Sequence, residues 1–200
     1  MIRLSDHIAA AGGWLSLEAF MQLALHHPQE GYYSSSIENI GQRGDFSTTP
    51  TLSPILAKAI IAHWKEACSR CGRRLPLLEI GAGSGALAVK ILERLGFWNR
   101  LNTDYVIVES SPRLREFQHL LLGGRAKIYS TMEKALKHCG GKAFIFSNEL
   151  VDAFPARVFE YTEQDWKEVG LVVKNGAVRE ELRPVRQQPL FSHMLEYGSQ

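Results

Sequence analysis

Apolar residues recur at helical spacing in the first part of the chain, and this pattern predicts three helices. Two short ones are expected over residues 4–11 and 17–27, with Ser16 placed to cap the second. Between residues 28 and 54 the periodicity is lost among proline, glycine and serine. This predicts a long loop, and long loops in compact domains are commonly functional. The third helix is expected over residues 53–71.

Short apolar runs alternate with helical segments in the middle of the chain. The expected strands are 75–80, 104–109, 126–129 and 143–146, and the expected helices start after Gly85 and cover 112–122 and 132–138. Strands that are apolar throughout are typical of sheets covered on both faces, and this order favours parallel pairing with right-handed crossovers. The pattern therefore predicts a doubly wound α/β sheet.

The pattern changes again after Pro155, where helical periodicity stops. Strands are expected over 157–162, 166–174 and 177–183, and Asn175-Gly176 is a strong hairpin signal between the last two. The remaining residues are polar. The organisation predicted is an N-terminal helical and loop region over 1–72, an α/β core over 73–156, and a β hairpin extension with a polar tail over 157–200.

Composition narrows the class of protein. With 45% hydrophobic and 22% charged residues, the chain matches ordinary globular proteins, and no apolar run approaches the ~20 residues of a membrane span. A net charge of +2 gives no field that would draw it to nucleic acid or to an anionic membrane. Three cysteines and an opening without an apolar signal core favour a reducing compartment, so we expect a cytoplasmic protein.

A glycine-rich loop, Gly81-Ala-Gly-Ser-Gly85, lies between an expected strand and an expected helix. Its spacing differs from the G-x-G-x-x-G of dinucleotide sites, and Glu79 just before it would repel a pyrophosphate but favour the ammonium and sulfonium of adenosylmethionine. Glu109 ends the next strand, where a carboxylate can accept hydrogen bonds from ribose hydroxyls. The alternative for the glycine loop is a tight turn that binds no ligand, and the alternative for Glu109 is a solvated acid at the end of a strand. The cofactor-binding candidates here are Glu79, Gly81, Ala82, Gly83, Gly85, Glu109 and Ser110.

A second group of polar residues follows the fourth expected strand. Asn148, Glu149 and Asp152 surround an apolar turn at the carboxyl edge of the sheet, where open α/β sheets bind ligands. Two carboxylates and an amide there could hold and deprotonate a nitrogen atom. The alternative is an ordinary helix cap. The position opposite the glycine loop favours a catalytic role for all three residues.

A metal site is the other chemistry that the sequence raises. Cys68 and Cys71 have the spacing of zinc ligands, and His63 lies just upstream. Since no second pair of ligands is present in the sequence pattern, we favour two inert thiols at a helix end and expect no metal.

Several blocks along the chain together resemble one family. They are 24–28 (ALHHP) with 31–33 (GYY), Gly41 with 44–50 (GDFSTTP) and 53–54 (SP), 79–85 (EIGAGSG), and 148–155 (NELVDAFP). In this order they resemble the MidA-like methyltransferases, whose mitochondrial members help assemble respiratory complex I by methylating an arginine of one of its subunits. The blocks span about residues 15–160.

The resemblance implies a Rossmann-like class I methyltransferase core that uses S-adenosyl-L-methionine. Together with the residue pattern, the expected fold is this core with an N-terminal helical and loop region and a C-terminal antiparallel β meander. The resemblance implies a protein substrate with an arginine acceptor. From charge and composition we expect no nucleic acid and no membrane insertion, and a homo-oligomer is left open. The resemblance also implies a loop folded over the cofactor. The cofactor-binding candidates in that loop are Gly44, Asp45, Thr48 and Pro50.

The chain also departs from the family pattern. Thr51 stands where an acid is common, and Ala57 stands where a glycine is common. Family members are usually much longer, and their later strands, including a characteristic Asp-Tyr-Gly strand end, have no counterpart in these 200 residues. The sequence is therefore interpreted as a fragment or as a shortened relative.

Three functional hypotheses follow. The first is an enzyme that methylates a protein arginine, in which Glu149 orients the guanidinium and Asp152 assists or receives the proton. The second is a catalytically silent scaffold that binds a partner through the aromatic loop at residues 31–33. The third, an NAD-linked oxidoreductase, is disfavoured by the loop spacing and by Glu79.

Overall fold

A computed structural model describes residues 3–33, 54–96, 102–162 and 165–185 of the chain. Contacts group the chain into two compact units. Met1–Glu30 and Phe154–Gln200 form a discontinuous unit, and Gly31–Ala153 form a central unit. The chain therefore leaves the discontinuous unit, builds the central one, and returns. The three-part organisation expected over 1–72, 73–156 and 157–200 stays a prediction.

The central unit contains a parallel sheet of four strands. Their order is β4-β3-β2-β5, and every neighbouring pair is parallel. The strands are β2 (Leu77–Ile80), β3 (Tyr105–Val108), β4 (Lys127–Tyr129) and β5 (Phe144–Ser147). The parallel pairing predicted from the continuous apolar runs is confirmed, and each expected strand is present within one or two residues of its expected bounds.

Helices cover both faces of this sheet, as predicted. They are α4 (Ile55–Arg70), α5 (Ala86–Arg94), α7 (Pro112–Leu122) and α8 (Met132–His138). Buried side chains of α4, α5 and α7 share one core cluster with Leu77, whereas Ala135 of α8 packs with Leu78 in a separate cluster. Adjacent residues of a strand face opposite sides, so the two clusters lie on the two faces. Within the described ranges, no helix has the length and apolar character needed to cross a bilayer.

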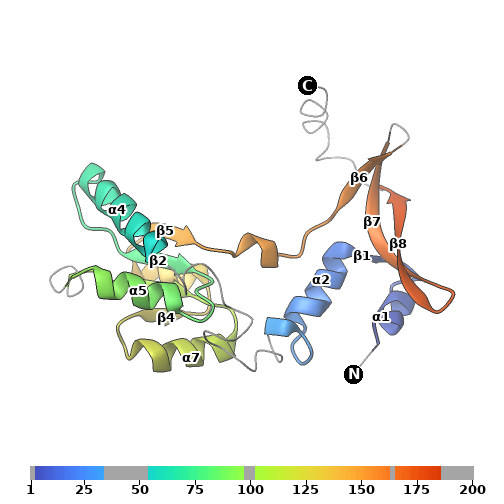
Figure 1. The fold of residues 1–200 in the computed structure, drawn as a ribbon, viewed down its shortest axis with the longest axis horizontal. Helices are drawn as coiled ribbons and strands as arrows, with labels where there is room; N and C mark the ends of the chain where they lie inside the picture. Colours follow the sequence, from blue (N-terminus) through green and yellow to red (C-terminus); the bar gives the residue numbers. More distant parts are fainter. Residues whose placement is uncertain (1–2, 34–53, 97–101, 163–164, 186–200) are drawn as a thin grey trace. The chain divides into compact units, whose positions relative to one another are not determined.

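The discontinuous unit is built on an antiparallel sheet (Figure 1). Its elements are α1 (Leu4–Ala10), β1 (Leu15–Ser16), α2 (Leu17–His26), β6 (Phe159–Thr162), β7 (Asp165–Lys174) and β8 (Ala177–Pro184). The predicted hairpin at Asn175-Gly176 joins β7 to β8, and both turn residues have positive φ, as a two-residue turn of this kind requires. The other edge of β7 is shared, since β6 pairs with its first half and β1 with Gly170 and Leu171.

Strand β1 is the element that the sequence pattern missed. Two residues are too short to show any periodicity, and their pairing partner lies more than 150 residues away. Close contacts hold this segment to β7 and β8. The Trp14 ring lies over Gly170 of β7, where any Cβ would collide with it, and the Trp14 Nε1 donates to the Glu181 carbonyl of β8 at 3.2 Å. A glycine is therefore required at position 170.

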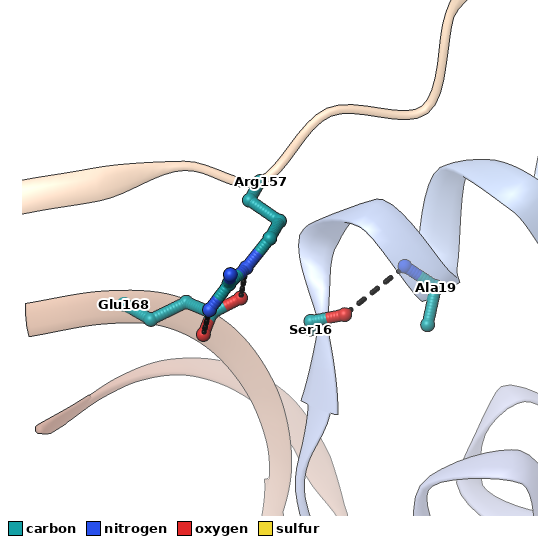
Figure 2. Close-up of polar contacts among 4 residues, drawn as sticks. All are labelled: Ser16, Ala19, Arg157 and Glu168. Carbon is teal, nitrogen blue, oxygen red and sulfur yellow. Dashed lines mark hydrogen bonds and ion pairs between the residues drawn. The ribbon is translucent and has the colours of Figure 1, made fainter. Parts of the chain in front are cut away.

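Polar contacts fix the local geometry of the discontinuous unit. Ser16 caps α2 as predicted, since its Oγ accepts a hydrogen bond from the Ala19 amide at 3.1 Å (Figure 2). The Arg157 guanidinium donates from Nε and Nη2 to the two carboxylate oxygens of Glu168, at 2.8 and 2.6 Å. These two parallel hydrogen bonds fix the orientation of Arg157, which lies just before β6, and of Glu168, which lies on β7.

Candidate active site

The register of the sheet brings three chain segments to one edge. Ile80 pairs with Val108 of β3 and with Ser147 of β5, so all three strands end side by side. The residues that follow them are the glycine loop, Glu109, and the segment from Asn148 to Asp152. The predicted meeting of these segments at the carboxyl edge is confirmed by the pairing, and the Gly81 amide donates to the Val108 carbonyl at 2.8 Å.

The glycine loop depends on left-handed backbone. Gly81, Gly83 and Gly85 have φ of 67°, 53° and 73°, a region that residues with a Cβ rarely adopt. Gly81 is also closely packed, because a Cβ there would lie 2.6 Å from Leu150 Cδ1. The turn after β5 is thus in contact with the loop after β2. Gly85 begins α5, and Ala82 accepts a hydrogen bond from the Gly85 amide at 2.8 Å.

Glu109 is a buried carboxylate with several donors around it. It is 6% exposed; its Oε1 accepts from the Ser111 amide at 3.0 Å, and its Oε2 accepts from Gln118 Nε2 at 3.4 Å. Burial raises the pKa of the Glu109 carboxyl, and the hydrogen bonds from Ser111, Gln118 and Gly83 oppose that rise. Ser110 beside it is exposed, and its carbonyl accepts from Arg115 at 2.7 Å.

Glu79 lies deeper than the sequence pattern indicated. Its side chain is on the core face of β2, 2% exposed, and the Tyr105 hydroxyl donates to its Oε2 at 2.6 Å. Burial raises the pKa of the Glu79 carboxyl to about 7, and the nearby negative charge of Glu109 adds to the rise while the hydrogen bond from Tyr105 opposes it. The predicted contact between Glu79 and a cofactor ammonium stays a prediction.

The pKa of Glu79 implies a specific dependence of stability on pH. Between the ordinary value of 4.5 and about 7, the unfolded chain has lost this proton while the folded chain still holds it. The free energy of unfolding therefore falls as pH rises through this window and levels off above it. We expect Glu79→Gln to reduce the fall between pH 5 and 8 in urea denaturation. An equal fall in both proteins would show that Glu79 is ionised in the folded chain.

The segment after β5 has a strained turn at its centre. Glu149 has φ of 49°, which is uncommon for a residue with a side chain and is often found at functional sites. This turn directs Leu150 toward Gly81, and the short helix η2 (Val151–Ala153) follows. Glu149 and Asp152 are exposed, and Asn148 is partly exposed. An exposed carboxylate pair beside the loop can reach an acceptor group that arrives from solution.

Tyr33 is a site residue to which the sequence analysis gave no catalytic or cofactor role. Its carbonyl accepts from Ser111 Oγ at 3.1 Å, which holds the residue next to the end of β3. Partial burial, followed by the negative charges of Asp152 and Glu109, raises the pKa of the Tyr33 hydroxyl. Tyr33 therefore lies in the field of both carboxylates. The sequence signal available was its place in the aromatic pair of the resembling block at 31–33.

Two further sets of residues were considered from the sequence: those of the predicted cofactor loop and the possible zinc ligands. Gly44, Asp45, Thr48 and Pro50 lie outside the described residues, so their predicted role stays a prediction. Among the residues that are described, no three histidine, cysteine or acidic side chains lie close enough together to hold a metal ion. Cys68 Sγ instead accepts a hydrogen bond from the Leu75 amide at 3.3 Å. This contact gives the thiol a structural role at the end of α4.

Comparison with known proteins decides the family. The sequence profile of an S-adenosyl-L-methionine-dependent methyltransferase family matches residues 55–200. The chain belongs to this methyltransferase family. Among curated methyltransferases, it is similar to "Protein arginine methyltransferase NDUFAF7, mitochondrial" of Xenopus tropicalis, with 27% identity over 192 residues, and of Danio rerio, with 28% over 193 residues. These matches cover 82% of this chain but only 44% and 45% of the relatives, so the chain spans less than half of their length.

Solved structures agree with the methyltransferase assignment. Two COG1565 superfamily proteins from Burkholderia thailandensis superpose with TM-scores of 0.72 and 0.70, at 30% and 26% identity. The first match covers 92% of this chain and 47% of that protein; the second covers 96% and 51%, and that protein was crystallised with S-adenosyl-homocysteine. The Rossmann-like methyltransferase fold expected from the resemblance is confirmed.

The residues of the site suit the cofactor of this methyltransferase family. Glycines with left-handed backbone shape the loop between β2 and α5, where backbone amides at the start of a helix can meet a ligand. The buried carboxylate Glu109 can accept hydrogen bonds from two ribose hydroxyls, and it lies at the end of the strand next to the loop. The adenosine part of S-adenosyl-L-methionine supplies such ribose hydroxyls.

Proposed function

We propose that this chain binds S-adenosyl-L-methionine and that the protein to which the site belongs methylates an arginine of a protein substrate. The observation that carries the proposal is the meeting of three strand ends, which brings the glycine loop, the buried Glu109 and the exposed Glu149 to one edge. Two of these groups suit the cofactor, and the third suits a cationic acceptor. The protein arginine methyltransferase relatives support the choice of acceptor.

In this reaction the arginine acceptor needs more activation than the methyl donor. The cofactor would supply a methyl group bound to a sulfonium. The new carbon–nitrogen bond forms as the carbon–sulfur bond breaks, and the sulfur keeps the electron pair of that bond. The arginine nitrogen then loses a proton. Arginine is a poor nucleophile because its guanidinium stays protonated and delocalised. Glu149 would bind the guanidinium and draw its charge to the distal nitrogens, and Asp152 would assist or take the proton.

A titration tests the cofactor assignment directly. We expect the 200-residue chain to bind S-adenosylmethionine or S-adenosylhomocysteine more tightly than NAD in calorimetry. The G-x-G-x-G spacing lacks the third glycine position of a dinucleotide loop. Tighter binding of NAD would contradict the proposal.

Replacement of Gly81 by alanine tests the role of the loop. The new side chain has to adopt φ near 67°, at a cost of about 1–2 kcal/mol, and its Cβ forces Leu150 to move. We expect binding of S-adenosylhomocysteine to weaken about tenfold, since a 1.4 kcal/mol change corresponds to a factor of ten. Calorimetry measures the affinity, and circular dichroism checks the fold.

Gly72 provides the matched control. It has φ of 64°, and a Cβ there would meet nothing within 4 Å. Gly72→Ala carries the same backbone strain without the collision, so it should lower the free energy of unfolding but leave the affinity unchanged. Equal affinities for both variants would show that the packing of Leu150 on Gly81 does not matter for binding.

The second candidate function is a cofactor-binding scaffold without transfer activity. Such a scaffold would use the glycine loop and Glu109 for the cofactor without a catalytic role for Glu149. The two functions differ in one measurement, the transfer of a labelled methyl group into proteins of a cell extract. Binding of the cofactor without labelling, by this chain and by any version extended through a downstream reading frame, would favour the scaffold.

A further inference from the structure

Helix α7 carries a polar residue in its buried stripe. Leu114, Gln118 and Leu122 follow one another at a spacing of four, and all three are buried, with Gln118 at 0% exposure. A buried amide costs stability unless its polar atoms are hydrogen-bonded. Gln118 is not among the site residues predicted from the sequence, although a single polar residue inside an apolar helix stripe is a signal that indicates it.

The hydrogen bonds of Gln118 reach two parts of the candidate active site. Its Nε2 donates to the Gly83 carbonyl at 2.8 Å and to Glu109 Oε2 at 3.4 Å. Both partners are acceptors, so the amide nitrogen has to face them. One side chain therefore connects the glycine loop to the carboxylate at the end of β3.

The oxygen of the Gln118 amide adds no hydrogen bond to the described part of the fold. Gln118 Oε1 is buried and has no hydrogen-bond partner among the described residues. A leucine of similar size would fill the stripe without a buried amide oxygen, but it would take the donor away from the Gly83 carbonyl and from Glu109 Oε2. The amide therefore serves the two contacts of its nitrogen. Helix α7 packs against the loop nearby as well, since a Cβ on Gly85 would lie 3.2 Å from Leu121 Cδ2 and 3.6 Å from Gln118 Cγ.

We infer that Gln118 is a positioning residue of the cofactor site, which holds the Glu109 carboxylate and the glycine loop in the arrangement that binds the ribose and the loop-facing part of the cofactor. This inference rests on the proposed function. Ser111 fixes one carboxylate oxygen of Glu109 and Gln118 contacts the other, so the carboxylate has a single orientation. Gln118 acts through Glu109 and Gly83 and needs no contact of its own with the cofactor.

The charge state of Glu109 gives a readout that a purely structural role would not move. Burial favours the protonated form of Glu109. Its ionised form is favoured by hydrogen bonds from the backbone amides of Ser111 and Gly83 and from the Gln118 side chain, and by the positive charge of Arg115. The negative charges of Glu79 and Glu109 disfavour each other, and Tyr33 faces Glu109 as well. Loss of the Gln118 donor should therefore raise the pKa of Glu109 further. A protonated Glu109 accepts less well from ribose hydroxyls, so affinity should fall first at low pH.

The test is calorimetric titration of Gln118→Leu with S-adenosylhomocysteine at pH 6 and at pH 8.5. We expect binding about tenfold weaker than wild type at pH 6 and within about threefold at pH 8.5. In a Glu109→Gln background, the same change at position 118 should weaken binding equally at both pH values, by no more than about threefold, because the titrating carboxyl is replaced while the contact with Gly83 is still lost. Leu120→Gln, at an exposed position of the same helix, should bind like wild type at both pH values.

Each other outcome overturns the inference. An equal loss at both pH values would assign Gln118 a structural role, and wild-type affinity at both would assign it none. If Gln118→Leu does not fold, Gln118→Met takes its place, and failure of both to fold would show that the residue serves the core. A wild-type chain that binds no S-adenosylhomocysteine at all would instead refute the proposed function, so the two failures are distinguishable.

Discussion

Replacement of Glu149 by glutamine is expected to lower methyl transfer about 100-fold while leaving cofactor affinity within about threefold of wild type. An acid–base group in a transition state contributes a factor of about 10² to 10⁴. Glu149 lies after β5 on an exposed, strained turn, so it can act on the acceptor, whereas the cofactor-binding candidates Glu109 and Gly83 lie elsewhere along the edge. An interaction made mainly in the transition state changes turnover and not ground-state binding.

The measurement for Glu149 is transfer of a labelled methyl group into a cell extract, with calorimetric titration of the cofactor in parallel. Asp152→Asn should show a smaller loss if Asp152 only assists. Glu133→Gln, which removes an exposed carboxylate on α8, is the matched control and should leave transfer unchanged. Labelling that persists in Glu149→Gln would remove this residue from the mechanism and leave it as a structural turn.

Replacement of Glu109 by alanine should weaken cofactor binding by about 1.5 to 3 kcal/mol, which is about 10- to 150-fold. The physical reason is the loss of charged hydrogen bonds to the ribose hydroxyls. The donors that now hold the carboxylate, the Ser111 amide and Gln118, would also lose their partner. Calorimetric titration with S-adenosylhomocysteine gives the affinity, and the far-ultraviolet circular dichroism should be unchanged.

Glu116 offers the control for Glu109. It is an exposed acid on α7, so Glu116→Gln changes the net charge of the chain without touching the carboxyl edge of the sheet. Its affinity for the cofactor should equal that of wild type. If Glu109→Ala binds normally, the ribose acceptor has to be another residue, and the assignment of the loop after β3 is wrong.

Much of the fold could be predicted because its elements leave local signals. The strands of the central unit are continuous apolar runs between turns, and the start of α2 and the β7–β8 hairpin have side chains, Ser16 and Asn175-Gly176, that act within a few residues of themselves. Strand β1 left no such signal, because Leu15 and Ser16 are strand residues only through pairing with β7. The grouping of the first 30 residues with those after 153 is likewise a property of contacts distant in sequence.

In the candidate site, too, some features have local sequence signals and others depend on contacts between residues distant in sequence. The sequence placed Glu109 and Glu149 after strands, and parallel pairing alone is enough to bring such residues to one edge. The spacing could not show that Glu79 points into the core and pairs with Tyr105, because the two residues come from different strands and meet only in the folded sheet. Gln118 was missed for a related reason: a helix pattern shows that a side chain is buried, not which loop it reaches.

The shared edge of β7 has a consequence for the order in which the chain can fold during synthesis. Residues 31–153 hold the four described strands of the parallel sheet and their helices in one continuous stretch of chain, so these contacts can form as soon as that stretch has left the ribosome. The helices α1 and α2 are made first, yet the core formed by Ile8 and Leu15 needs Leu171 of β7. The apolar side chains of α1, β1 and α2 therefore stay exposed until more than 140 further residues have been added. We expect a chaperone to bind this part of the chain during synthesis.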